Sequence, residues 1–300
     1  MFTGCGTALV TPFARDFTLD EAALRRLVRR QIDAGIDFLV PCGTTGESPT
    51  LTRAEHLRVV EITVDESHGK VPVLGGAGGY NTAEVIELAE DLAQIGVDGI
   101  LSVTPYYNKP TQEGLYQHYR AIASSISLPI VVYSVQGRTG VNVEPATLAR
   151  LAQIDNIVGV KEASGNILQM ASVIQQVPSS FLVLSGDDAI TLPLIALGGR
   201  GLISVASNEI PAEMAQLVQF CLSGDFASAR DLQRRLLPLM EVNFIESNPI
   251  PVKAAMALMG LLEPIYRLPM VAPKTENLER IKSVLKQAGL LARRSVPVAN

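Results

Sequence analysis

Short runs of apolar residues recur along the chain. Each run is rich in Val, Ile or Leu and lacks the alternation of a half-exposed strand, which is typical of parallel strands buried on both faces. They recur roughly every thirty residues, the interval of βα units. The pattern predicts eight strands, at residues 5–10, 38–42, 71–75, 99–103, 129–133, 157–161, 181–185 and 201–205.

The segments between these runs carry apolar positions at helical spacing. Asp20 is placed to cap a helix at 19–34, and Thr52 with Glu55 forms a capping-box pattern for the next one. Further helices are predicted at 82–95, 111–126, 144–154, 168–177, 189–198 and 212–222. Strands and helices that alternate in this way over about 225 residues favour a (β/α)8 barrel over a doubly wound sheet.

The strand pattern stops after residue 224. Three more helices are predicted, at 225–244, 249–260 and 275–288. We therefore expect a barrel over residues 1–224, a helical extension over 225–291 and a loose tail over 292–300.

Composition narrows the function classes. The chain is 47% hydrophobic and 18% charged, which is typical of a globular protein, and its net charge of −5 argues against a basic nucleic-acid-binding face. No segment has the length and apolarity of a membrane helix, and the first residues lack the pattern of a signal peptide. Three cysteines far apart in the sequence do not suggest a disulfide framework, so the expected location is the reducing cytoplasm.

Polar residues at the ends of the predicted strands are the candidates for chemistry, because (β/α)8 barrels act at that end. Lys161 closes an apolar run, and burial disfavours an ammonium group, leaving an amine that can form a Schiff base. A solvated lysine, or one paired with Glu162, is the alternative. Thr44, Tyr107 and Tyr133 offer hydroxyls for proton transfer, although such residues also cap turns.

Two further signals concern anions and metals. Arg138, in a Gly-rich loop, is placed either to grip a carboxylate or simply to lie on the surface. The Gly-rich segment 75–79 lacks the lysine and the spacing of known phosphate-binding loops. The three histidines have no ligand spacing, so we expect no metal and no cofactor.

The ordered motifs GTTGE, TPYYNKP, YxxxGRTG, VGVKEASG and SGDD resemble those of the dihydrodipicolinate synthase family. This family belongs to the superfamily of pyruvate-dependent Schiff-base aldolases that includes N-acetylneuraminate lyase. The resemblance implies condensation of pyruvate with aspartate semialdehyde in lysine and diaminopimelate synthesis. It also implies a homotetramer built as a dimer of dimers.

Residue roles follow from the resemblance alone. Lys161 would form the imine with pyruvate and Tyr133 would be its general acid and base. Thr44 and Tyr107, the latter donated by a neighbouring subunit, would complete the relay of hydroxyl groups. The remaining substrate contacts would be Thr45 with the backbone of Gly186 and Ile203 for the pyruvate carboxylate, and Arg138 for the semialdehyde carboxylate.

Two departures and two alternatives bear on the substrate. Ser134 and Gln136 replace the Asn and Pro that usually follow the catalytic tyrosine, so the loop of Arg138 is expected to differ in shape. A sister aldolase acting on a sialic or 2-keto-3-deoxy sugar acid would share Lys161 and Tyr133 but generally not Arg138. A silent keto-acid-binding barrel would need no nucleophile at all.

A regulatory lysine site is a further expectation from the resemblance. The matching positions are Ser48, His56, Tyr80, Glu84 and Tyr106. Pro49, Arg53 and Tyr80 differ from lysine-sensitive members, and the ring of Tyr80 replaces a compact amide. We therefore expect weak or absent inhibition by lysine, with simple packing of a dimer interface as the alternative role of these residues.

Overall fold

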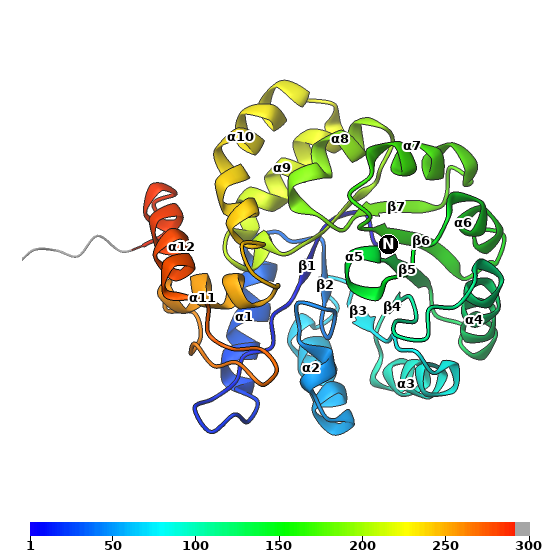
Figure 1. Ribbon diagram of the computed structural model, residues 1–300, viewed down its shortest axis with the longest axis horizontal. Coiled ribbons are helices and arrows are strands. Elements are labelled where there is room, and N and C mark those ends of the chain that lie inside the picture. Colours follow the sequence, from blue (N-terminus) through cyan, green and yellow to red (C-terminus); the bar gives the residue numbers. More distant parts are fainter. Residues whose placement is uncertain (292–300) are drawn as a thin grey trace, which may run out of the picture.

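The computed structural model, which describes residues 1–291, is a barrel of parallel strands surrounded by helices (Figure 1). The strands follow the order β2-β1-β8-β7-β6-β5-β4-β3, and a parallel bridge from Leu39 to Val73 joins the two end strands. The (β/α)8 prediction is confirmed. The strands are β1 (Gly4–Ala8), β2 (Phe38–Val40), β3 (Leu74–Gly76), β4 (Gly99–Val103), β5 (Ile130–Ser134), β6 (Ile157–Glu162), β7 (Leu182–Ser185) and β8 (Gly201–Ser204).

The observed strand ends differ from the predicted ones by a few residues, and proline explains part of the difference. Pro41 and Pro72 have no N–H for a ladder, so β2 ends at Val40 and β3 begins only at Leu74. Cys42 then turns the chain with a φ of 55°. The wide run predicted at residues 38–42 is thus a three-residue strand followed by a turn that belongs to the site.

Helices cover the outside of the barrel (Figure 1). The Asp20 cap and the Thr52–Glu55 capping box are both present. The predicted helix at 189–198 begins instead as a 3-10 turn, where Asp187 caps Ala189. The barrel helices are α1 (Glu21–Asp33), α2 (Arg53–Ser67), α3 (Thr82–Ile95), α4 (Gln112–Ser125), α5 (Gln136–Thr139), α6 (Pro145–Leu151), α7 (Ile167–Gln176), α8 (Thr191–Ala196) and α9 (Pro211–Ser223), with 3-10 turns at Ser48–Thr50, Asp188–Ile190 and Ala206–Asn208.

Three helices follow the barrel, as predicted: α10 (Phe226–Val242), α11 (Ile250–Leu258) and α12 (Thr275–Gln287). They pack beside α1 and α9 (Figure 1). The predicted tail at 292–300 lies outside the described residues, and the division into domains at residue 224 stays a prediction. Among residues 1–291, every helix is too short or too polar to traverse a lipid bilayer.

Two apolar layers position the strand ends. The larger one fills the space between barrel and helices, and a smaller one fills the barrel interior. Tyr133 belongs to the interior layer, together with Leu101, Leu184 and Ile203. Because successive side chains of a strand point to opposite faces, a residue in register with Tyr133 on the next strand also points inward. That residue is Lys161.

Candidate active site

Lys161 and Tyr133 are neighbours at the ends of β6 and β5, where the ladder pairs them directly. Lys161 is 5% exposed, and its Nζ lies 4.2 Å from the centre of the Tyr133 ring. Within residues 1–291 no carboxylate forms an ion pair with this lysine. An amine in this position is held against an aromatic face, inside an apolar barrel and beside a phenol hydroxyl.

Glu162, the alternative partner of Lys161, points to the other face of the sheet. Its Oε1 accepts a hydrogen bond of 2.7 Å from Gln169 Nε2 on α7, and its Oε2 accepts one from the backbone of Ser164. Burial raises the pKa of Glu162, against the lowering effect of these hydrogen bonds. The pairing of Lys161 with Glu162 considered from the sequence is therefore absent.

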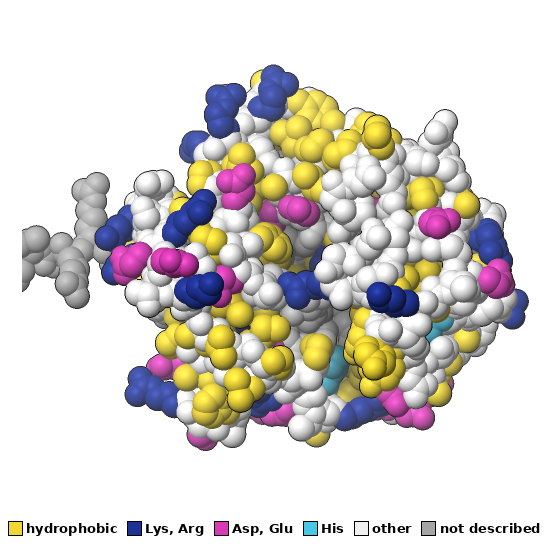
Figure 2. Space-filling model, in the orientation of Figure 1, with side chains coloured by type: hydrophobic (Ala, Val, Ile, Leu, Met, Phe, Trp, Pro, Cys, Tyr) yellow, Lys and Arg dark blue, Asp and Glu magenta, His cyan; other side chains and the backbone are white. Residues whose placement is uncertain are grey.

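A cavity of about 410 Å³ opens over the strand ends, and its lining includes Tyr133 but not Lys161. Figure 2 shows this face of the molecule hollowed near its centre, with Lys and Arg side chains at the rim. Five of the residues expected from the sequence share a wall of the cavity with Tyr133. They are Thr44, Ser48, His56, Tyr106 and Arg138.

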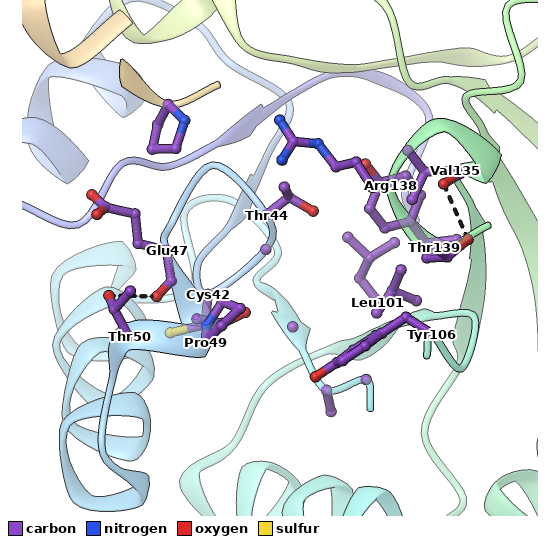
Figure 3. A pocket seen from close by; sticks show the side chains of 18 of the residues that line it. Cys42, Thr44, Glu47, Pro49, Thr50, Leu101, Tyr106, Val135, Arg138 and Thr139 are labelled. Carbon is purple, nitrogen blue, oxygen red and sulfur yellow. Dashed lines mark hydrogen bonds between the residues drawn. The ribbon is translucent and has the colours of Figure 1, made fainter. Parts of the chain in front are cut away.

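Arg138 comes from α5, a short helix in the segment predicted as a loop. Its side chain reaches across the opening toward Thr44 (Figure 3). Nη2 donates a hydrogen bond of 2.8 Å to the backbone oxygen of Asn248, although Arg138 as a whole is exposed. A guanidinium anchored at one end and open at the other is suited to bind an anion.

Thr45, Gly186 and Ile203 are not among the residues that line the cavity. Thr45 is 2% exposed, and its Oγ1 accepts a hydrogen bond of 2.9 Å from Asn248 Nδ2. The backbone N–H of Gly186 donates to Glu162 O at 2.8 Å, so this N–H is already used within the sheet. Ile203 is fully buried in the barrel interior.

Tyr107 does not reach the cavity of its own chain. It is 91% exposed and has a φ of 65°, a conformation that few residues other than glycine adopt. Its neighbour Tyr106 turns inward instead and lines the cavity. Of the expected hydroxyl groups, the structure thus brings together those of Thr44 and Tyr133 and leaves that of Tyr107 on the surface.

The residues expected at a lysine site fall into two groups. Ser48, His56 and Tyr106 line the cavity, whereas Tyr80 and Glu84 lie outside its wall. His56 Nε2 forms a hydrogen bond of 2.8 Å with Gly76 O, and burial lowers the pKa of His56. The rings of Tyr80 and Tyr106 meet edge to face, with their centres 5.2 Å apart. Burial, followed by the nearby Tyr80 and Glu84, raises the pKa of Tyr106.

The glycines at 75–79 have a packing role. A Cβ on Gly76 would lie 2.2 Å from Cys42 O, and one on Gly78 would lie 2.6 Å from Val103 N. Either contact is too short for a real side chain. These glycines let the β3 segment approach its neighbours closely at the cavity wall, which accounts for them without a phosphate.

Sequence reasoning missed two contributions from the helical extension. Asn248, between α10 and α11, contacts both Thr45 and Arg138. Lys253 of α11 forms an ion pair of 2.6 Å with Glu47, and both side chains are essentially unexposed. Glu47 ends the turn that carries Thr44 and Thr45, and its carboxyl group points away from the opening (Figure 3). The only signal for Asn248 is a polar residue before a proline between two helices.

The chain is thus a (β/α)8-barrel enzyme, and the residues expected to be reactive lie at the carboxyl ends of its strands. A model of the Dihydrodipicolinate synthetase family matches residues 1–288. The chain belongs to this family, and the resemblance seen in its motifs is confirmed.

Named relatives are similar in sequence or structure to nearly the whole of this chain. A 4-hydroxy-tetrahydrodipicolinate synthase of Koribacter versatilis is 55% identical over 294 residues, 98% of each chain. The crystal structure of dihydrodipicolinate synthase from Aquifex aeolicus is 42% identical, with a TM-score of 0.95, and covers 97% of this chain and all of that one. A structure of the synthase from Cyanidioschyzon merolae with lysine bound is 39% identical, with a TM-score of 0.93, and covers 97% and 99%.

Proposed function

We propose that this chain condenses pyruvate with L-aspartate 4-semialdehyde to 4-hydroxy-tetrahydrodipicolinate, in lysine and diaminopimelate synthesis. The observation that carries the chemistry is the buried amine of Lys161, without an ion-pair partner in residues 1–291 and 4.2 Å from the centre of the Tyr133 ring. The curated relatives supply the product, since their name is that of the synthase.

The first half of the reaction takes place on Lys161. Its amine attacks the keto carbon of pyruvate, and loss of water leaves an imine. Removal of a proton from the pyruvate methyl group converts the imine to an enamine. Tyr133, whose ring lies against the amine, serves as the acid and base for these transfers, and Thr44 is a second hydroxyl in the cavity wall.

The second half joins the two substrates. The enamine carbon attacks the aldehyde carbon of the semialdehyde, and the aldehyde oxygen takes up a proton to become the hydroxyl group. The amino group from the semialdehyde then attacks the imine carbon and displaces the amine of Lys161, which closes the ring. Arg138 holds the semialdehyde carboxylate. The pyruvate carboxylate is held by Thr45 together with the backbone at Gly186 and Ile203. Because the N–H of Gly186 is already used within the sheet, the contribution of Gly186 is the space that its missing side chain leaves.

A second copy of the chain completes the site. Tyr107 is 91% exposed on a strained turn, which fits a ring that enters a neighbouring barrel. Leu168 and Leu197 are further large apolar side chains left exposed, on and beside the helices α7 and α8. These surfaces support the homotetramer, a dimer of dimers, that the family resemblance implies.

Lysine is expected to bind weakly. The Tyr80 ring packs against Tyr106, where a ligand would need room. Arg53 forms an ion pair of 2.6 Å with Asp91, so its charge is engaged on α2 and α3 and not presented to the cavity. We also infer a cytoplasmic location, supported by the buried free thiols of Cys5, Cys42 and Cys221.

Trapping of the imine tests the proposed function. Pyruvate with borohydride should inactivate the chain and leave a reduced adduct on Lys161, found by peptide mass spectrometry. Lys109 and Lys253 serve as internal controls, and an adduct on either of them would overturn the assignment. Parallel assays with aspartate semialdehyde and with N-acetylmannosamine separate the synthase from a sugar-acid aldolase, which would use only the latter.

A further inference from the structure

Two residues that line the cavity carry a buried oxygen without a hydrogen-bond partner among residues 1–291: Glu47, through Oε2, and Asn248. Asn248 is 4% exposed and lines the cavity, and its Oδ1 has no hydrogen-bond partner among residues 1–291. Buried acceptors without a donor are rare and unfavourable. An acceptor of this kind in the wall of an active-site cavity indicates a donor that the substrate brings.

The other polar atoms of Asn248 fix its position. Nδ2 donates to Thr45 Oγ1 at 2.9 Å, and the backbone oxygen accepts from Arg138 Nη2 at 2.8 Å. Asn248 therefore lies between the residue proposed for the pyruvate carboxylate and the residue proposed for the semialdehyde carboxylate. The unpartnered Oδ1 belongs to a side chain that lies between these two residues and is itself buried.

The second substrate carries a donor close to its carboxylate. In L-aspartate 4-semialdehyde the ammonium and carboxylate groups are attached to the same carbon. When Arg138 binds the carboxylate, the ammonium group therefore lies near Asn248, which contacts Arg138. The Glu47 carboxyl group also has an unpartnered oxygen, but it is less suited, because it points away from the opening and already forms an ion pair with Lys253 (Figure 3). The amide oxygen of Asn248 is the matching acceptor.

We propose that Asn248 Oδ1 accepts a hydrogen bond from the amino group of the semialdehyde and makes the site selective for aldehydes that carry this group. The assignment rests on the proposed substrate pair. A neutral amide also suits the chemistry better than a carboxylate would. It orients the nitrogen without strongly stabilising the ammonium, and the nitrogen must lose a proton before it can displace Lys161.

The test compares two aldehydes that differ only in the amino group. For Asn248→Ala, kcat/KM for aspartate semialdehyde should fall roughly 10- to 100-fold, the usual effect of losing a hydrogen bond to a charged group. The inhibition constant of succinate semialdehyde against the pyruvate-loaded enzyme should change less than about threefold, because this aldehyde has no amino group. Any disturbance of Thr45 would affect both aldehydes equally. Equal losses for the two aldehydes would overturn the proposal.

A matched control separates recognition from folding. Asn243 is also fully buried in the extension, has an unpartnered Oδ1 and donates to Glu209 Oε2 at 2.6 Å, but it does not line the cavity. Asn243→Ala should leave the ratio between the aldehydes unchanged, whatever it does to stability. Asn248→Ser, a smaller perturbation, should reproduce the selective loss, and a ratio like that of the wild type would contradict the proposal.

The same experiment distinguishes a failure of the proposed function from a failure of the role proposed for Asn248. If the wild-type chain forms the pyruvate adduct but does not use aspartate semialdehyde, the proposed function fails. If the wild type uses it and the Asn248 variants lose both aldehydes alike, only the role of Asn248 fails.

Discussion

Replacing Lys253 with methionine should destabilise the fold in a pH-dependent way. The Lys253 ammonium is unexposed, lies 2.6 Å from Glu47 Oε1 and faces the Phe13 ring at 4.4 Å. Methionine keeps much of the length of the side chain but removes the charge. The Glu47 carboxylate, only 1% exposed, then loses its ion-pair partner and keeps only the weaker influence of Arg267.

The size of the destabilisation depends on which form of Glu47 costs less free energy in the folded variant, a buried carboxylate without its partner or a protonated carboxyl group. Burial already raises the pKa of Glu47, and the nearby Lys253 opposes that rise. Without Lys253 we expect the folded variant to hold a proton on Glu47, because burial is then opposed mainly by Arg267, while the unfolded chain releases that proton above the ordinary pKa of 4.5. Holding the proton costs at most about 1.4 kcal/mol per pH unit above that value, hence at most about 4 kcal/mol at pH 7.5 and about 1.4 kcal/mol at pH 5.5. The higher figure agrees with the ~3–5 kcal/mol expected when one partner of a buried pair is removed.

Urea unfolding followed by circular dichroism, at one protein concentration, measures this loss at both pH values. The difference between wild type and Lys253→Met should shrink as the pH falls. The double variant Glu47→Gln, Lys253→Met has no charge to bury, so its loss should be smaller at pH 7.5 and nearly independent of pH. A loss that is equal at both pH values, or a double variant as unstable as the single one, would refute the reasoning.

Four further outcomes are expected. Burial raises the pKa of Glu209 to about 8, so the folded chain holds a proton that the unfolded chain gives up; wild-type stability should decline from pH 5 to 8, and Glu209→Gln should flatten that decline in urea unfolding. Arg138→Ala should lower kcat/KM for aspartate semialdehyde roughly 100-fold while the pyruvate adduct still forms, and unchanged kinetics would favour the sugar-acid aldolase. Mixed Tyr107→Phe and Lys161→Ala chains should regain activity in hybrid dimers, and verified hybrids without activity would place Tyr107 in its own barrel. Titration with lysine should show weak or no inhibition, and strong inhibition at submillimolar lysine would contradict the expected crowding by Tyr80.

The fold was predictable because its signals are local. Each strand is an apolar run long enough to recognise, and parallel strands put their carboxyl ends on one face, which brings Tyr133 and Lys161 together once the barrel is assumed. The strand limits were less predictable, since Pro41 and Pro72 interrupt the ladder without interrupting the apolar run.

The rest of the site depends on contacts between distant segments. Glu47 and Lys253 are 206 residues apart, and Thr45 and Asn248 are 203 apart. No periodicity links such positions. A lysine in an amphipathic helix usually faces water, and only the packing of the extension on the turn after β2 buries Lys253. The direction of Tyr107 was equally hidden, because it follows from a positive φ in a loop.

The links from Asn248 and Lys253 back to the turn after β2 have a consequence for synthesis on the ribosome. One edge of strand β1 pairs with β8, so the barrel cannot close until about 200 residues have been made. Even then the turn with Thr44 and Thr45 lacks its anchors, which lie in the last fifth of the chain. At about 5–20 residues per second, the 206 residues between Glu47 and Lys253 take roughly 10–40 s to translate. The nascent chain therefore fixes the turn with Thr44 and Thr45 late, and a chain truncated after the barrel would carry Lys161 without the anchors that hold this turn.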